Sequence, residues 1–553
     1  MTPKTLQILC LCLILGIGQI IASHAEEEII NRAEPGDEDA FGHAVDVSGD
    51  TFITSHTSYE GNRGGIHIFK REKKEWKSQA IIKAPNAAIR DWFGWAVAID
   101  SDTAVAGAYE DGGKGDEAQQ GDNQGRLTDG PGAVYIYVRT GKDWAEQAKL
   151  KSEDNALSDR FGFSVDIDGD TVIIGSPHDD DAGENSGSVY IFERAGDTWK
   201  ETFKIVASDA AAGDKFGWDV GLERGTAVVG AHFDDDAGSK SGSAYIFVRN
   251  ADGTWTEQTK LTADDAAKGD QFGVSVDISV ASNAYVIAGT PGKKGVGSRS
   301  GAAYVFVGSN GTWAQQAKLV PGDNQKQDQF GAAVAIDINR VLVGAPKVDG
   351  KLIADSGAAY SFLRVGTDWV EQVKVEAKNV KPDEKDALNI GDNFGNAVAI
   401  ANRGKLAIVG ARWDNTEALG QDDGSVYVYD TELGDLGIAF AVEPSSTLVT
   451  TTLGQIKRSA LLQNFPNPFN PETWMPYVLA NDVPVTIGIY DVGGQIVRQL
   501  HIGVQPAGGY LSREHAAYWD GKDRWGEPVS SGVYFYTLRA GTFQATRRMV
   551  ILK

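Results

Sequence analysis

Short runs of alternating apolar and polar residues recur along most of the chain. Residues 187–192 read Gly-Ser-Val-Tyr-Ile-Phe. Similar runs, each opened by glycine, lie at residues 132–137, 242–247, 301–306, 357–362 and 424–429. A period of two built from Val, Ile, Tyr and Phe predicts β-strands rather than helices.

A second pattern groups these strands into repeats. The sequence Asp-x-Phe-Gly occurs seven times, beginning at Asp39, Asp91, Asp159, Asp214, Asp270, Asp328 and Asp392. After each Phe but the first, an apolar run ends in a triplet related to Gly-Ala-Pro, at residues 107–109, 175–177, 230–232, 289–291, 344–346 and 410–412. A further strand is expected around each of Trp76, Trp144, Trp199, Trp255, Trp313 and Trp369. Each repeat therefore carries four strands, as a β-propeller blade does.

The seventh repeat has no Trp strand after Tyr429. A blade without its outer strand would expose a sheet edge. Ile30 precedes Phe41 by the offset at which an apolar residue precedes most of the other repeat Phe residues. We therefore expect Glu26–Asn31 to supply the missing strand. The predicted fold is all-β: a seven-bladed β-propeller of four-stranded blades over residues 26–432, with an N-terminal strand closing the ring.

Phe-Gly followed by Gly-Ala-Pro at this spacing resembles the FG-GAP repeats of integrin α-subunits and their bacterial relatives. The resemblance covers residues 26 to about 432. It implies that each Phe packs between neighbouring blades and that the glycines allow close backbone approach. We expect the Asp before each Phe to accept hydrogen bonds from turn N–H groups.

The same resemblance raises the question of calcium, because integrin-type repeats often carry an Asp-rich calcium loop after the Phe-Gly strand. The best copy here is Asp166, Asp168 and Asp170. Calcium takes six to eight oxygen ligands from a loop that wraps it, and a turn of two or three residues is too short to do so. We therefore expect that the protein requires no cofactor. Binding of Ca²⁺ by these three residues remains an alternative.

A second acidic set follows the Gly-Ala-Pro triplets. It comprises Asp179, Asp180, Asp181, Asp234, Asp235 and Asp236, together with Asp111 and Asp116 in a long insert. Strands in a blade alternate in direction, so these loops and the connections between blades emerge on one face. In integrins this face meets ligand, and the resemblance places a ligand-binding surface here. A merely solvated, solubilising rim is the alternative.

The first 25 residues have the pattern of a secretory signal peptide. Lys4 precedes an apolar run, and Ser23-His24-Ala25 ends it with small residues. An N-terminal membrane anchor is the alternative. We expect a secreted or cell-surface protein with no transmembrane segment after processing. The net charge of −24 argues against nucleic acid as a partner.

The C-terminal part departs from the repeats. Residues 433–462 are expected to be a linker, because they are rich in Ser, Thr and Pro. Residues 463–553 contain alternating runs and Gly turns, which predict an Ig-like β-sandwich. Their order of motifs resembles the C-terminal sorting domain of type IX secretion substrates and the Ig-like domain of flagellar hook-capping proteins. This implies outer-membrane secretion machinery as a partner and attachment at the cell surface; a plain adhesive module is the alternative.

Catalytic motifs do not stand out. The eight His residues are scattered, and Gly162-Phe-Ser164-Val-Asp166 lacks the second Gly of a nucleophile elbow. We therefore expect a binding or adhesion module for an extracellular protein or glycan rather than an enzyme. An extracellular carbohydrate-active hydrolase and a purely structural envelope component remain the alternatives. The ligand and the oligomeric state do not follow from the sequence.

Overall fold

The computed structural model describes residues 26–30, 40–58, 62–73, 75–84, 90–112, 130–350, 354–377, 391–414, 424–430, 459–461, 472–492, 494–510 and 516–551. The named elements in this part of the chain are all strands. Among the residues described, no helix is long and apolar enough to cross a membrane.

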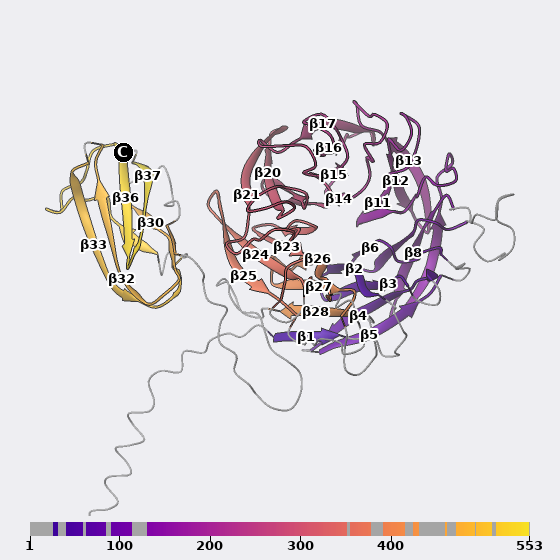
Figure 1. The fold of residues 1–553 in the computed structure, drawn as a ribbon, viewed down its shortest axis with the longest axis horizontal. Helices are drawn as coiled ribbons and strands as arrows, with labels where there is room; N and C mark the ends of the chain where they lie inside the picture. Colours follow the sequence, from indigo (N-terminus) through magenta and orange to yellow (C-terminus); the bar gives the residue numbers. More distant parts are fainter. Residues whose placement is uncertain are drawn as a thin grey trace, which may run out of the picture.

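Four-stranded antiparallel sheets recur along residues 26–430, as in a β-propeller (Figure 1). Sheets 1 to 6 are formed by β2–β5, β6–β9, β10–β13, β14–β17, β18–β21 and β22–β25, and sheet 7 by β26–β28 with β1. The first strands are β2 (Phe41–Ser48), β6 (Val97–Asp100), β10 (Ser164–Asp168), β14 (Val220–Glu223), β18 (Val276–Val280), β22 (Ala333–Asp337) and β26 (Phe394–Ala401). The second strands are β3 (Thr51–His56), β7 (Thr103–Ala108), β11 (Thr171–Ser176), β15 (Thr226–Ala231), β19 (Ala284–Thr290), β23 (Arg340–Ala345) and β27 (Leu406–Ala411).

The glycine-opened runs form the third strands. These are β4 (Ile66–Glu72), β8 (Ala133–Thr140), β12 (Ser188–Ala195), β16 (Ser243–Arg249), β20 (Ala302–Ser309), β24 (Ala358–Val365) and β28 (Ser425–Asp430). The Trp-containing runs form the fourth strands, as predicted: β5 (Glu75–Ile82), β9 (Asp143–Leu150), β13 (Thr198–Ile205), β17 (Trp255–Leu261), β21 (Thr312–Leu319) and β25 (Asp368–Val375).

Sheet 7 takes its fourth strand from the other end of the described chain. β1 (Glu26–Ile30) pairs antiparallel with β28, and Ile30 lies opposite Val426. In sheet 3 the equivalent pair is Ile205 opposite Val189. The register predicted from the apolar offset before Phe41 is therefore confirmed.

Burial follows the position of a strand within its sheet. All six residues of β7 are buried, whereas β9 has exposed and half-buried positions and only its last residue, Leu150, is buried. The second strand is apolar on both faces because neighbouring sheets cover both of them, and the fourth strand meets solvent. Burial thus decreases from the second strand of a sheet to the fourth.

Each repeat Phe is buried in an apolar cluster shared by two neighbouring sheets. Phe161, for example, packs with Val134 and Ile136 of sheet 2 and with Tyr190 of its own sheet, where the ring centroids are 5.3 Å apart. The glycine before the third strand lies against the next Phe. Gly187 has φ +84°, and a Cβ there would collide with the Phe216 carbonyl oxygen. Glycine is therefore required at this point by both conformation and space.

The described residues between 459 and 551 form three further sheets around an apolar core of their own, which we call the C-terminal sandwich after the sequence prediction. Its strands are β29 (Ala460–Leu461), β30 (Thr473–Met475), β31 (Tyr477–Leu479), β32 (Val483–Tyr490), β33 (Ile496–Gln505), β34 (Gly508–Tyr510), β35 (Ala517–Trp519), β36 (Gly532–Ala540) and β37 (Phe543–Ile551). Leu461 belongs to its core although the sequence places that residue in the linker, because β29 pairs with β31. The sandwich thus begins earlier than expected.

Candidate functional site on the loop face

The Asp before each repeat Phe has a structural role. Asp159 and Asp214 are buried, and their carboxylates accept hydrogen bonds from the N–H groups of Ala156 (2.7 Å) and Ala211 (2.8 Å). Burial raises the pKa of each of these two carboxyls to about 6, although the backbone hydrogen bonds oppose the shift. The predicted turn function of this Asp is confirmed.

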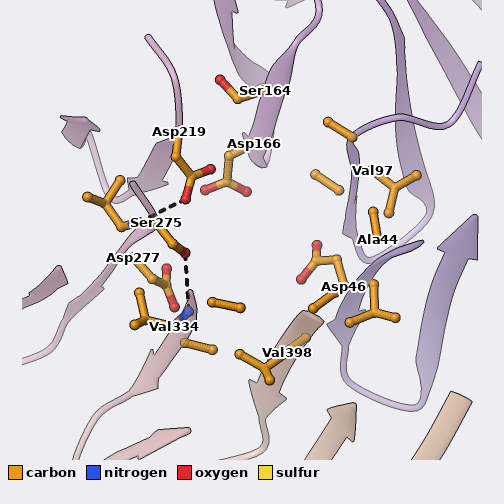
Figure 2. A pocket seen from close by; sticks show the side chains of 18 of the residues that line it. Ala44, Asp46, Val97, Ser164, Asp166, Asp219, Ser275, Asp277, Val334 and Val398 are labelled. Carbon is orange, nitrogen blue, oxygen red and sulfur yellow. Dashed lines mark hydrogen bonds between the residues drawn. The ribbon is translucent and has the colours of Figure 1, made fainter. Parts of the chain in front are cut away.

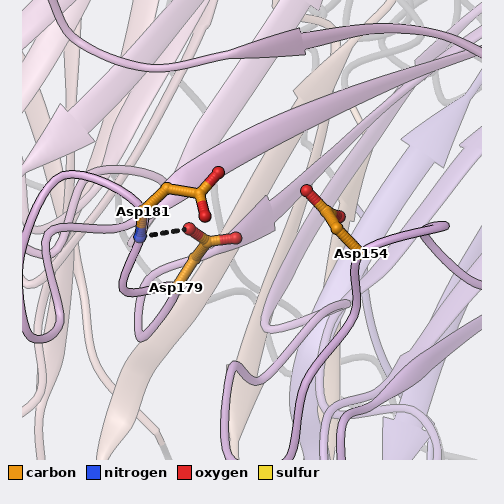
Figure 3. A group of neighbouring side chains, drawn as sticks. All are labelled: Asp154, Asp179 and Asp181. Carbon is orange, nitrogen blue, oxygen red and sulfur yellow. Dashed lines mark hydrogen bonds between the residues drawn. The ribbon is translucent and has the colours of Figure 1, made fainter.

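In sheet 3 the acidic loop residues lie around a lysine. The carboxylate oxygens of Asp154, Asp179 and Asp181 lie within 4.8 Å of one another (Figure 3). The Lys204 ammonium, from β13, lies 2.7, 3.0 and 2.5 Å from them in that order. The Tyr190 hydroxyl donates to Asp179 at 2.7 Å. The position that a cation would take among these oxygens is filled by the lysine, which is part of the chain.

This arrangement shifts the ionisation of its members. Burial alone would lower the pKa of Lys204, but hydrogen bonds to Asp154, Asp181 and Asp179 outweigh burial and raise it. The same contacts hold the pKa of Asp154 below its usual value despite burial. The Lys204 cluster is therefore charged on both sides at neutral pH.

Sheet 4 repeats the cluster. Lys260 lies 2.7 Å from Asp209, 2.7 Å from Asp234 and 2.6 Å from Asp236, and the Tyr245 hydroxyl donates to Asp234. In sheet 2, Lys149 contacts Asp111 at 2.7 Å, with Tyr135 donating to the same carboxylate.

The structure thus brings some of the predicted ligand-binding residues together and separates others. Asp111, Asp179 and Asp234 are buried in lysine clusters, and Asp181 and Asp236 are exposed members of them. Asp180 and Asp235 are exposed and accept backbone hydrogen bonds within their own loops. Asp116 lies outside the described residues. Of the predicted set, Asp180 and Asp235 have the exposed carboxylates that no lysine contacts.

The sequence analysis missed Lys204, Lys260, Asp154 and Asp209. The sequence did contain a signal, because a lysine and a tyrosine recur together in sheets 2 to 6. The lysine lies at one position of the fourth strand: Lys149, Lys204, Lys260, Lys318 and Lys374. The tyrosine lies at one position of the third strand: Tyr135, Tyr190, Tyr245, Tyr304 and Tyr360. In sheet 5, Lys293 replaces the loop Asp, and it contacts Asp270 at 2.6 Å and Asp265 at 3.2 Å.

The predicted calcium residues point to separate partners. Asp166 accepts a hydrogen bond from the N–H of Leu222 (2.6 Å), and Asp168 accepts one from the N–H of Arg224 (2.6 Å). Asp170 pairs with Arg194 at 2.5 Å. The first two bonds join sheet 3 to sheet 4, so these carboxylates link neighbouring sheets.

A cavity of about 380 Å³ lies among the first strands of the sheets. Asp46, Asp166, Asp219 and Asp277 project toward it (Figure 2). Each accepts a hydrogen bond from a backbone N–H of the next sheet; for Asp46 and Asp277 the donors are Ile99 and Ile336, both at 2.7 Å. The acidic lining therefore also holds neighbouring sheets together.

Burial dominates the ionisation of this lining. It raises the pKa of Asp46 and of Asp219 to about 6, and it raises the pKa of Asp166 and Asp277 well above the usual value. Nearby carboxylates add to the effect at Asp166, where Asp46 and Asp277 repel a further negative charge. The cavity accordingly carries less negative charge at neutral pH than its composition suggests.

Recurrent four-stranded sheets with a Phe-Gly contact between neighbours define a propeller-like repeat protein. The chain belongs to the FG-GAP repeat family, whose model matches residues 76–137, 144–192, 199–247, 255–306, 313–362 and 369–429, together more than half of the chain. Each matched segment begins at a fourth-strand Trp and ends in the third strand of the following sheet.

No curated protein matches the chain. Among solved structures it is similar to PorZ of Porphyromonas gingivalis, described as an essential bacterial surface component of the type IX secretion system. The TM-score is 0.39 at 13% identity, over 94% of this chain and 60% of PorZ. The chain spans about 60% of the length of PorZ, and so distant a likeness supports no statement about function.

Proposed function

We propose that this protein is a secreted or surface-displayed binding module whose repeat sheets close into a seven-bladed propeller and present the loop face to an extracellular protein or glycan. One observation carries the proposal: sheets 7 and 1 make the contacts that consecutive sheets make elsewhere. Phe41 packs with Val426 and Val428, as Phe161 packs with Val134 and Ile136.

Backbone contacts at the same junction support this reading. Gly424 has φ +80°, and a Cβ there would collide with the Phe41 carbonyl oxygen, as at Gly187 and Phe216. The Asn396 side chain donates to the carbonyl oxygens of Gly42 (3.2 Å) and His43 (2.9 Å). A closed ring gathers the loops between second and third strands, and those between sheets, around one mouth of the channel. Such loop clusters on a rigid frame are common binding surfaces.

Export is the second part of the proposal. The C-terminal sandwich has its own apolar core, which includes Trp519, Tyr536 and Met549. A module with a separate core can serve as a sorting signal without disturbing the fold of the propeller. We assign it the role of a sorting domain read by outer-membrane secretion machinery, as its motif resemblance implies.

Face-selective blocking tests the binding proposal. Residues 26–553 contain no cysteine, so a single introduced thiol can be coupled cleanly to a polyethylene glycol chain. Ser239 is exposed in the loop between β15 and β16, and Asp197 is exposed in the turn between β12 and β13, on the opposite face. Ser239→Cys and Asp197→Cys therefore place the thiol on one face or the other. Binding is measured on arrays of extracellular proteins and glycans.

We expect at least one saturable ligand, bound without turnover, whose binding is lost when Ser239→Cys is blocked and retained when Asp197→Cys is blocked. The reverse pattern, or the absence of any ligand, would count against a binding role for the loop face.

A hydrolase is the second candidate, because a carboxyl with a raised pKa is what a glycosidase uses as its acid. Burial raises the pKa of Asp166 and of Asp277 in the cavity well above the usual value. Incubation of a bound glycan with the wild type and with Asp277→Asn distinguishes the candidates: cleavage by the wild type alone would establish catalysis, whereas an intact glycan in both supports a binding module.

A further inference from the structure

Aromatic side chains line one side of the cavity mouth. Trp95, Phe163 and Trp218 occupy the position immediately after Phe-Gly in sheets 2, 3 and 4. Their rings form a continuous series: the centroids of Trp95 and Phe163 are 5.7 Å apart, and those of Phe163 and Trp218 are 4.5 Å apart. Tyr109 packs against both Trp95 and Phe163, and Phe233 joins Trp218 through the His232 ring. We call Trp95, Phe163 and Trp218, with Tyr109 and Phe233, the aromatic arc.

The arc exceeds what packing of the repeats requires. The equivalent positions in sheets 5 and 6 are Val274 and Ala332, and those sheets have the same strand order. Trp95 and Trp218 are only partly buried, so their rings present apolar area to a ligand. Exposed aromatic area beside a cavity is typical of binding sites.

Cations accompany the arc. Arg160 lies over the Tyr109 ring at 5.5 Å, Lys215 lies 5.2 Å from both the Trp218 and the Phe233 rings, and Lys240 lies over Phe233 at 4.1 Å. Arg160 and Lys215 occupy the variable position of Asp-x-Phe-Gly, where sheets 5 and 6 have Gln271 and Gln329. A ring and a cation therefore recur together in consecutive sheets.

In the parts of the chain that the structure describes, no ion pair involves Arg160, Lys215 or Lys240, although the chain has 76 acidic and 52 basic residues other than His. Burial and the charges of Arg160 and Lys240 lower the pKa of Lys215. The arc is thus a region of positive potential on an acidic molecule, and an anion would relieve that repulsion.

Unpaired buried nitrogen atoms lie in the same place. His232 is 2% exposed, its ring is 4.1 Å from that of Trp218, and its Nδ1 has no hydrogen-bond partner among the described residues. The Nε of Arg160 and the Nε2 of His178 are buried and unpaired in the same sense. Buried polar atoms without a partner are costly and call for an explanation. Arg160 and His178 are half-buried as residues, so a ligand bearing acceptor oxygens can reach these two side chains, whereas the Nδ1 of His232 is enclosed.

We propose that the aromatic arc and the cations Arg160, Lys215 and Lys240 bind an acidic oligosaccharide that carries a carboxylate or a sulfate on its repeating unit. The C–H face of a sugar ring packs on an aromatic ring, and its anionic group accepts charge-assisted hydrogen bonds from Arg and Lys. The pairing of one ring with one cation in successive sheets fits a polymer with one charge per repeat better than a peptide. This assignment rests on the proposed binding function and names its ligand class.

The test uses the chain of residues 26–553 and four probes: an oligogalacturonate, a sulfated galactan oligosaccharide, maltohexaose as a neutral sugar, and poly-glutamate as an acidic peptide. Affinity is measured by calorimetry and by quenching of tryptophan fluorescence. Lys215→Gln and Trp218→Val introduce the residues that sheet 5 has at these positions. Lys200→Gln, exposed on β13, removes a charge elsewhere.

We expect one of the two acidic oligosaccharides to bind and the neutral one not to, and the bound probe identifies carboxylate or sulfate as the anion. Lys215→Gln should weaken binding at least about tenfold, the effect of losing one charge-assisted hydrogen bond. Trp218→Val should weaken binding similarly, and the melting temperature of this variant should stay near that of the wild type. The control Lys200→Gln should bind with wild-type affinity.

Equal binding of maltohexaose, binding of poly-glutamate alone, or affinity unchanged in Lys215→Gln would overturn the assignment. A ligand from the array experiment that is blocked at Ser239→Cys but insensitive to Lys215→Gln and Trp218→Val would leave the binding function standing and remove only this site.

Discussion

Lys204 balances the negative charge of the acidic loops of sheet 3. Its side chain is 20% exposed, and its ammonium contacts three carboxylates, one of them buried. A charged group that is paired and partly desolvated stabilises the fold mainly because removing it leaves the opposite charges unpaired. The cluster is therefore a structural staple between the fourth strand, the loop between second and third strands, and the connection from sheet 2.

Replacing this lysine tests the staple. Lys204→Met keeps the apolar stem and leaves three carboxylates facing one another. We expect the free energy of unfolding in denaturant to fall by about 1–3 kcal/mol. Lys200→Met on the same strand is the matched control and should change it by no more than about 0.5 kcal/mol. An equal loss in both variants would show that Lys204 has no special role.

The Lys204→Met variant should also respond to calcium, through its melting temperature. The three carboxylates of the Lys204 cluster are hard oxygen ligands of the kind that Ca²⁺ takes. Wild-type protein should melt at the same temperature in millimolar calcium and in chelator, whereas Lys204→Met should melt higher in calcium. A calcium-dependent melting temperature in the wild type would locate a cation site elsewhere in the chain.

Asp219 links stability to pH. Its pKa is raised by burial from an ordinary 3.8 to about 6 in the folded state. The folded state therefore binds the proton more tightly than the unfolded state, so its contribution is fully present below pH 3.8 and is lost as pH rises through 6. Relative to Asp219→Asn, whose replaced side chain does not titrate, the wild type should gain about 1.4 kcal/mol in unfolding free energy between pH 7.5 and pH 5. A flat difference across this range would contradict the assignment.

At this scale the sequence predicted local roles better than distant contacts. The Asp before each Phe was correctly assigned to its turn, because its partner lies three residues away. Asp179 was assigned to a ligand surface because Lys204 lies 25 residues further along, in another strand. Only the comparison of repeats links the two positions, through the joint recurrence of Lys and Tyr.

At the scale of strands and sheets, the recurrent four-stranded antiparallel sheets were predictable from the sequence. Phe-Gly marks the contact between sheets, the glycine-opened run marks the third strand, and Trp marks the fourth. The linker boundary was not predictable, because Ala460–Leu461 is too short a strand to produce a period-two signal and is defined by its pairing with β31.

Removal of β1 tests sheet 7. A chain that starts at Asn31 leaves the edge of β28 unpaired, and the chain that starts at Glu26 is its control. We expect the cooperative melting temperature of the repeats to fall by several degrees, because the backbone pairing of one strand is lost and the edge is exposed. Calorimetry measures this directly, and superimposable melting curves would mean that β1 does not contribute to the fold.

The fourth strands are also joined to one another. The Trp199 indole N–H donates to the Gln147 amide oxygen of the previous sheet at 2.8 Å, and the pairs Trp144–Gln79, Trp313–Gln258 and Trp369–Gln316 repeat this bond. A double-mutant cycle with Trp199→Phe and Gln147→Leu should give a coupling energy of about 0.5–1.5 kcal/mol in denaturant unfolding. Additive effects of the two substitutions would show that the bond contributes nothing.

For the whole molecule, the sequence predicted two structural units but not the chemistry of the loop face. The repeat frame hides that chemistry, because Arg160 and Lys215 stand at positions that the repeat leaves free. The role of these two side chains depends on aromatic rings from neighbouring sheets, such as Tyr109 beside Arg160. Such a surface becomes visible only when the sheets are placed side by side.

The two units should unfold independently. The core of the sandwich contains only residues from Leu461 onward, and the repeat cores contain none of them. An ion pair between Arg547 and Asp368, both partly exposed, joins the sandwich to sheet 6, and pairs of this kind contribute about 0–1 kcal/mol. A chain ending at Asp430 should therefore melt within a few degrees of the repeat transition of the full chain.

That independence makes the sorting proposal testable in cells. If the sandwich directs export, the chain ending at Asp430 should fold but accumulate in the periplasm. Asp368→Asn, which removes the ion pair and leaves the Arg547 hydrogen bond to the Leu461 carbonyl oxygen in place, should reach the surface normally. Surface labelling and fractionation measure the distribution, and calorimetry of the recovered truncated protein verifies that it is folded. Normal display of a folded truncation would show that residues 459–551 do not direct export, and would favour an adhesive role for the sandwich.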